Sequence, residues 1–100
     1  MGYEMTLLDQ LQAQRQAISE IADRHGVVRL RLFGSVARGE DRAESDVDFL
    51  VAMKDDRGFD DFLALAEELE HLLGRKVDLI SERGLSPYFR PYIEAEARPL

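Results

Sequence analysis

A strand, a helix and a second strand follow one another in the second half of the chain, and this pattern restricts the fold most strongly. The apolar stretch 47–53 has the length and composition of a buried strand. Residues 59–73 carry apolar side chains at helical spacing, and Gly74 follows them as a residue suited to end a helix. Residues 76–81 are typical of another strand. Two strands joined by a helix of about four turns predict a βαβ crossover.

The first half of the chain adds one helix and one strand. Thr6 and Asp9 have the spacing of a capping box, and apolar residues recur near helical spacing up to about Arg24, so we expect a single helix there. Residues 28–33 alternate between apolar and polar side chains, as a half-buried strand does. The polar segment 34–45 connects this strand to the next and could hold one short helical turn.

A short helix over 91–97, with Pro91 at its first position, ends the predicted order α-β-turn-β-α-β-α. This order predicts an α/β or α+β fold, in which a small mixed sheet has helices packed on one of its faces. No repeat, low-complexity segment or linker divides the 100 residues. We therefore expect one domain over residues 1–100.

Composition excludes several classes of site and partner. The chain has no cysteine, which rules out disulfides, thiolate zinc sites and a cysteine nucleophile. Its 20 acidic and 13 basic side chains give a formal net charge of −7, which argues against a protein that binds nucleic acid directly by neutralising phosphates. The longest apolar run, 49–53, is far too short to cross a membrane, and residues 1–5 lack a signal pattern. We therefore expect a cytoplasmic protein with no membrane contact.

Two carboxylates lie at the start of the strand over 47–53. Asp46 and Asp48 are two residues apart and project from one face, whereas Val47 and Phe49 project from the other. Like charges on a strand otherwise built for burial repel and lose hydration unless a cation or hydrogen-bond donors neutralise them. Asp78 adds a third carboxylate in the next apolar strand. Three acids on neighbouring strands could bind two magnesium ions, which prefer oxygen ligands.

Gly34 and Ser35 begin the connection that follows the first strand. A glycine turn that enters a helical turn can present backbone N–H groups and a hydroxyl to a phosphate, and glycine permits close approach. The spacing from Gly34 to Gly39 also matches a P-loop. Residues 40–41 are both acidic where that motif needs Lys and Ser or Thr, so we reject a P-loop.

The complete motif has a counterpart in a known superfamily. Gly34-Ser35, ten residues, Asp46-Val-Asp48 and the later strand acid Asp78 resemble the nucleotidyltransferase superfamily that includes DNA polymerase beta and kanamycin nucleotidyltransferase. The resemblance implies that a nucleoside monophosphate, usually AMP from ATP, is transferred to a hydroxyl while pyrophosphate leaves. It also implies that the Gly-Ser pair holds the triphosphate, that the first two acids bind both magnesium ions, and that the third completes the catalytic-metal site and could act as base for the acceptor hydroxyl.

The residues around the motif are more similar still to one subfamily. Phe-Gly-Ser-Val-Ala-Arg-Gly-Glu over 33–40 and Ser-Asp-Val-Asp-Phe-Leu-Val over 45–51 resemble the minimal nucleotidyltransferases, the antitoxin partners of HEPN-domain toxins. This resemblance covers about residues 28–82. In that subfamily the acceptor is a tyrosine of the toxin, which the modification inactivates.

Two arginines lie in the same connection. Arg38 and Arg42 could meet phosphate oxygens or a partner through their fork-shaped guanidinium groups. They could equally form surface ion pairs with Glu40, Asp41 or Glu44. The sequence leaves both roles open, and we include Arg38 with Gly34 and Ser35 among the candidate phosphate-binding residues.

Three functional hypotheses follow. The first is a magnesium-dependent nucleotidyltransferase that transfers AMP from ATP to a partner HEPN toxin and forms a hetero-oligomer with it. The second is a binding module that neutralises its partner by occlusion, with a vestigial or regulatory nucleotide site. The third is transfer to a small molecule, which needs an acceptor pocket that a chain of this length scarcely provides. The motif-bearing stretch 28–82 uses over half of the chain, so we expect a partner to supply the acceptor.

Overall fold

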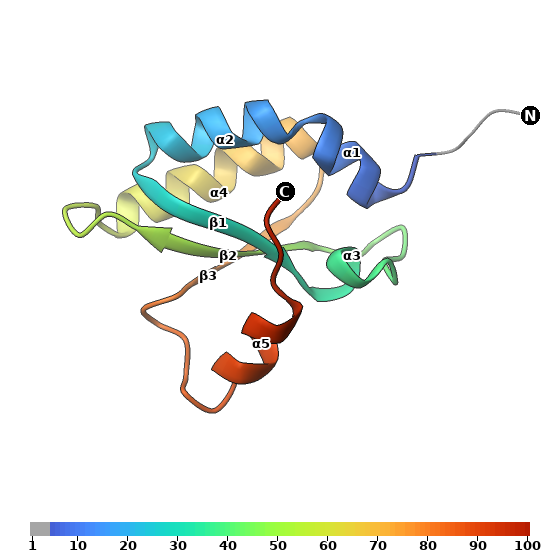
Figure 1. Ribbon diagram of the computed structural model, residues 1–100. Coiled ribbons are helices and arrows are strands. Elements are labelled where there is room, and N and C mark those ends of the chain that lie inside the picture. Colours follow the sequence, from blue (N-terminus) through green and yellow to red (C-terminus); the bar gives the residue numbers. More distant parts are fainter. Residues whose placement is uncertain (1–4) are drawn as a thin grey trace, which may run out of the picture.

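Five helices and three strands build the part of the chain that the computed structural model describes, residues 5–100 (Figure 1). The expectation about a signal pattern rests mainly on residues 1–4, which lie outside this range. In chain order the elements are α1 (Leu7–Ala13), α2 (Arg15–Arg24), β1 (Val27–Phe33), α3 (Gly34–Arg38), β2 (Val47–Met53), α4 (Phe59–Leu73), β3 (Val77–Ser81) and α5 (Arg90–Glu96). No helix within 5–100 has the length and apolar character needed to span a membrane.

The single helix expected up to Arg24 is wrong, because α1 and α2 are separate helices that meet at Gln14. The predicted start is right: the Thr6 hydroxyl accepts the N–H of Asp9 at 3.0 Å, and the Asp9 carboxylate accepts the N–H of Thr6 at 3.1 Å. The two helices pack against different partners, α1 against α3 and α2 against α4 and β1. Apolar spacing along one chain segment cannot reveal this change of direction.

The sheet has the order β1-β2-β3, with β1 antiparallel and β3 parallel to the central strand β2. The parallel β2–β3 pair, connected by α4, confirms the βαβ crossover. The register places Asp48 of β2 opposite Phe33 of β1 and opposite Asp78 of β3. The crossover therefore places Asp48 and Asp78, two of the three predicted site carboxylates, side by side on adjacent strands.

The two faces of the sheet are covered by different helices. Helices α2 and α4 lie on one face, where Val47, Phe49 and Val51 are fully buried in the main core with Leu65 and Leu69 of α4. The short helix α5 lies on the opposite face (Figure 1). The mixed sheet is confirmed, but the expectation that helices pack on one face only is therefore wrong.

The position of α5 has a simple cause in the alternation of β2. Leu50 projects from the same face as Asp48, and it is fully buried in a smaller cluster with Phe33 and Leu85. Ile93 and Ala97 pack against this cluster from the C-terminal part of the chain. The face that carries Asp48 therefore also has apolar side chains to bury, and the C-terminal part of the chain covers them.

Candidate active site

Three carboxylates lie near the start of β2 and β3. Asp46 directly precedes β2, Asp48 is the second residue of β2, and Asp78 is the second residue of β3. All three side chains belong to half-buried residues. Asp48 and Asp78 are paired in register on adjacent parallel strands, whose spacing is about 4.8 Å. The two carboxylates therefore project side by side from the face that carries α5.

This crowding changes the acidity of the central carboxyl group. The pKa of Asp48 is raised to about 6, mainly because burial disfavours the charged form. The charges of Asp78 and Asp46 raise it further, as does a hydrogen bond with Asp78, whereas the charge of Arg38 opposes the shift. Near neutral pH the face holds an excess of negative charge that a cation would relieve.

One cation of the chain already approaches this face. Lys76, two residues before Asp78, places its Nζ 3.8 Å from Oδ2 of Asp46. Its side chain is 68% exposed, so this ion pair is weak and easily exchanged. No motif predicted a role for Lys76. Its spacing from Asp78 indicates the same side of the sheet, but its contact with Asp46 depends on how β2 and β3 are aligned.

The Gly34-Ser35 turn lies directly against the carboxylates. Gly34 is buried with a φ of +79°, in the left-handed region that favours glycine, and a Cβ at this position would overlap Oδ2 of Asp48. Any other residue would therefore be strained and would displace the carboxylate. The Ser35 side chain does not cap α3, and within residues 5–100 its hydroxyl makes no hydrogen bond. That hydroxyl is available to a ligand.

Arg38 lies at the end of α3 and is engaged by two acids. Its Nε donates to Glu40 at 3.0 Å, and its Nη1 donates to Glu96 of α5 at 2.7 Å. These hydrogen bonds raise the pKa of Arg38, so the guanidinium stays charged. The sequence left open whether Arg38 forms surface ion pairs. It does, and one partner, Glu96, was not foreseen because it lies 58 residues away.

The donor set fits magnesium when a nucleotide supplies further ligands. Within residues 5–100 no three acidic or histidine side chains form a ready-made metal site. Asp46 is drawn toward Lys76, and like charges separate when no cation holds them. Magnesium, however, often takes only one or two carboxylates and completes its shell with water and substrate phosphates. Asp48, Asp78 and Asp46 provide those oxygens next to the Gly34-Ser35 turn, whose backbone lies against Asp48.

A family model described as a nucleotidyltransferase domain matches residues 14–100. The chain belongs to this family. The match spans all three strands and all three carboxylates. It confirms the superfamily that the motif predicted.

Similar proteins agree with this assignment. Protein adenylyltransferase MntA of Thermococcus cleftensis is 42% identical over 66 residues, which cover 66% of this chain and 67% of that protein. The solved structure of a candidate minimal nucleotidyltransferase is 49% identical, covers 99% of this chain and 100% of the other, and has a TM-score of 0.87. A chain in the solved complex of tri-AMPylated Shewanella oneidensis HEPN toxin with MNT antitoxin shares the fold. It is 21% identical, with a TM-score of 0.67, and the match covers 87% of this chain and 68% of that chain.

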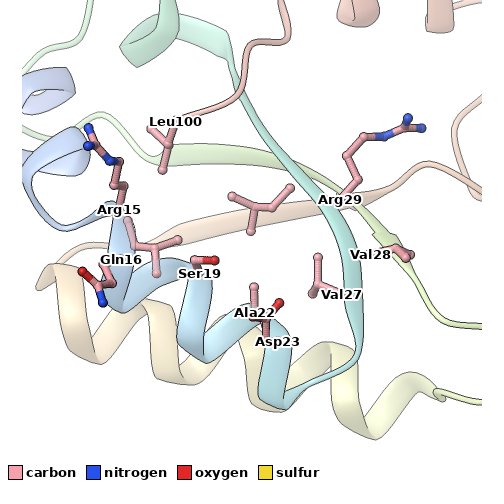
Figure 2. A pocket seen from close by; sticks show the side chains of 11 residues that line it. Arg15, Gln16, Ser19, Ala22, Asp23, Val27, Val28, Arg29 and Leu100 are labelled. Carbon is pink, nitrogen blue, oxygen red and sulfur yellow. The ribbon is translucent and has the colours of Figure 1, made fainter.

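The nucleotidyltransferase also has a groove that lies away from the carboxylates. Figure 2 shows this groove, of about 520 Å³, between α2 and β1, with Leu100 among its lining residues. The acidic side chain in its lining is Asp23, and none of the three site carboxylates takes part. The groove is therefore separate from the candidate active site.

Proposed function

We propose that this nucleotidyltransferase transfers AMP from magnesium-bound ATP to a tyrosine hydroxyl of a HEPN-domain partner, and that it acts in the cytoplasm as the antitoxin of that partner. The observation that carries the proposal is the register of Asp48 opposite Asp78, with Asp46 on the same face and Gly34 against it. One relative is named a protein adenylyltransferase, which supports AMP as the transferred group. A solved structure with the same fold contains a HEPN toxin, which supports a HEPN-domain partner.

Asp46 and Asp48 would hold two magnesium ions, and Asp78 would complete the site of the catalytic ion. Bound magnesium supplies charge neutralisation on the triphosphate and makes the acceptor hydroxyl more acidic. The backbone of Gly34 and the free hydroxyl of Ser35 hold the triphosphate beside Asp48. These groups hold the α-phosphorus over the carboxylate face. Positioning and electrostatic stabilisation therefore supply most of the rate enhancement.

Asp78 is placed to receive the proton of the acceptor. As the acceptor oxygen bonds to the α-phosphorus, the bond from that phosphorus to the bridging oxygen breaks, and pyrophosphate leaves with its electron pair. The hydroxyl proton passes to the Asp78 carboxylate. Asp48 is the poorer base for this role, because it lies against Gly34 on the side of the triphosphate.

The acceptor comes from a second protein in this proposal. The described elements form one small sheet and its covers, and the face with the carboxylates is bounded by α3 and α5. A tyrosine side chain presented by a partner can reach this face. The product is a modified partner, and the two chains form a hetero-oligomer at least during the reaction.

Labelling of the partner tests the proposed function. The full chain, labelled ATP, magnesium and the protein encoded by the neighbouring reading frame are mixed. We expect the partner to become labelled. The double substitution Asp46→Asn and Asp48→Asn should lower the labelling rate by at least about a thousandfold, because it removes both carboxylates assigned to the metal ions.

Asp23→Asn is the matched control, since it removes an acidic group in the groove between α2 and β1. This variant should label the partner at the normal rate. Equal labelling by the double variant and the wild-type chain would contradict the proposed function.

A second candidate is neutralisation by occlusion, and exposed aromatic side chains favour it. Tyr88, Phe89 and Tyr92 lie at and before the start of α5 and are 83%, 61% and 72% exposed. Aromatic residues of this kind are enriched where proteins bind one another. If the triple substitution of the three carboxylates by Asn still protects cells from the partner, occlusion is the function. Loss of protection would favour catalysis.

A further inference from the structure

An ion pair connects the helix beside the carboxylates to the helix that covers their face. Arg38 ends α3, and Glu96 ends α5. Their contact, Nη1 to Oε1, is 2.7 Å, and Glu40 holds the Nε of the same guanidinium at 3.0 Å. The side chains of Arg38, Glu40 and Glu96 are 42%, 67% and 36% exposed. All three can exchange partners without unpacking the core.

The Arg38–Glu96 ion pair lies close to the face that carries the site carboxylates. The charge of Arg38 lowers the pKa of Asp48, so the guanidinium is within electrostatic reach of that carboxylate. Helix α3, which carries Arg38, begins at Gly34, whose backbone lies against Asp48. The Arg38 guanidinium therefore connects the Glu96 carboxylate to the face that carries the site carboxylates.

A bound triphosphate and Glu96 would compete for the same donors. Arg38 with its two glutamates carries a net charge of −1, because one positive charge meets two negative charges. A phosphate that bonds to this guanidinium while Glu96 stays in place would lie beside a like charge, which is unfavourable. Arginine binds phosphate best with its fork free for two parallel hydrogen bonds.

We propose that Glu96 competes with the phosphates of the nucleotide for Arg38 and thereby sets the affinity of this chain for the nucleotide. The inference rests on the proposed function, because it takes the triphosphate to lie beside α3. When the nucleotide binds, Arg38 exchanges Glu96 for a phosphate oxygen, while Glu40, two residues away, keeps the guanidinium in place. An exposed ion pair is weak, so a polyanion can displace it.

The exchange leaves α5 in its place, because other contacts hold this helix. Arg90 at its start donates to the backbone oxygen of Glu82 at 2.8 Å. Just beyond its end, Arg98 and Leu32 exchange two backbone hydrogen bonds of 2.7 and 2.8 Å. A variant that loses only the Glu96 carboxylate should therefore remain folded.

Binding of a non-hydrolysable ATP analogue with magnesium, measured by calorimetry, tests the inference. Glu96→Gln keeps the size of the side chain and removes its charge. We expect its Kd to be about two- to fivefold lower than that of the wild-type chain. The difference should shrink as salt is added, because both the pair and the phosphate contact are exposed.

Glu94→Gln is the matched control. Glu94 lies on the same helix with 40% exposure, but it pairs with Arg90 and Arg31. Its substitution should leave the Kd unchanged. In an Arg38→Gln background, Glu96→Gln should also have no effect, because the group for which Glu96 competes is gone.

Three outcomes would overturn the inference. In the first, Glu96→Gln binds the analogue with unchanged or weaker affinity. In the second, it binds more tightly even without Arg38, which would indicate a general charge effect. In the third, the wild-type chain does not bind the analogue at all, and then the proposed function fails as well. If the wild-type chain binds and labels its partner while Glu96→Gln is unchanged, only the inference fails.

Discussion

Asp48 lies between two fully buried residues, Val47 and Phe49, and faces Asp78 on the next strand. Its carboxylate thus stands at the border between the core of the molecule and its charged face. The folded chain holds this group at an energetic cost, because burial and neighbouring charges both disfavour the ionised form. The charged Asp48 carboxylate lowers the stability of the folded chain. Such destabilising residues are common in sites that bind a cation or a substrate.

The cost at Asp48 predicts a pH dependence of stability. Its pKa is about 6 in the folded chain, against the ordinary value of 3.8, so between pH 4 and pH 6 the folded state binds more protons than the unfolded state. Stability therefore falls as the pH rises through this window. Without magnesium and at pH 7, Asp48→Asn should be more stable than the wild-type chain by about 1–2 kcal/mol, a value reduced for partial exposure of the group.

Urea unfolding in the presence of a chelator measures this difference. It should shrink toward zero as the pH falls from 7 to 4. The same substitution at the exposed Asp23 should give a difference that does not follow this window. A gain of Asp48→Asn that stays constant across the window would contradict the assignment of the shift to Asp48.

At the scale of residues, the sequence predicted what depends on local alternation and missed what depends on distant partners. Asp46, Asp48 and Asp78 could be placed on one face because side chains alternate along a strand and a crossover joins the two strands. The partners Lys76 and Glu96 could not be assigned. Their contacts with Asp46 and Arg38 follow from the register of β3 and the position of α5, which no local pattern specifies.

Helix α5 is the element for which local reasoning was least sufficient. Its extent, Arg90–Glu96, was predicted within one residue, and Pro91 marked its start. Its face of the sheet was not predicted. That position depends on Leu50, whose burial opposite the main core becomes visible only when β2 is aligned with its neighbours. The break at Gln14 was missed for a related reason, since it arises where two helices find different partners.

Helix α5 has few buried side chains, which predicts that it unfolds locally more readily than α4. None of its residues is fully buried, and Ile93 is the residue within the helix that packs against the smaller cluster. Ile93→Ala should therefore speed hydrogen exchange in α5 about tenfold or more, while exchange in α4 changes little. Amide exchange followed by mass spectrometry separates the two helices.

Tyr92→Ala serves as the neighbouring control for this experiment. Tyr92 lies beside Ile93 on the same helix but is 72% exposed. Its truncation should leave exchange in α5 nearly unchanged. If Ile93→Ala speeds exchange equally in α4 and α5, then the helix is not a separate unit of stability.

The molecule holds Asp46, Asp48 and Asp78 close together on its small sheet, within a chain of net charge −7. Such a fold gains stability from any cation that binds the folded state alone. Magnesium at about ten times a millimolar Kd should add about 1.4 kcal/mol, which for a domain of this size raises the Tm by about 5–10 °C.

Thermal unfolding with magnesium, compared with sodium at the same ionic strength, measures this effect. The wild-type chain should show the rise in Tm with magnesium only. The double substitution Asp46→Asn and Asp48→Asn should abolish the rise. An equal rise in both salts would show that general screening, and not a bound ion, stabilises the molecule.

The pairing of Asp48 with Asp78 has a consequence for how this chain can vary. A slip of β2 by one residue would turn Phe49 outward and bury both carboxylates that flank Val47, so the core and the charged face would be lost together. A residue inserted within β2 would do the same, whereas one inserted in the polar connection 39–45 leaves the register intact. Natural changes of length in this protein should therefore collect in its connections, while β2 keeps its spacing even in lineages where the chemistry is no longer needed.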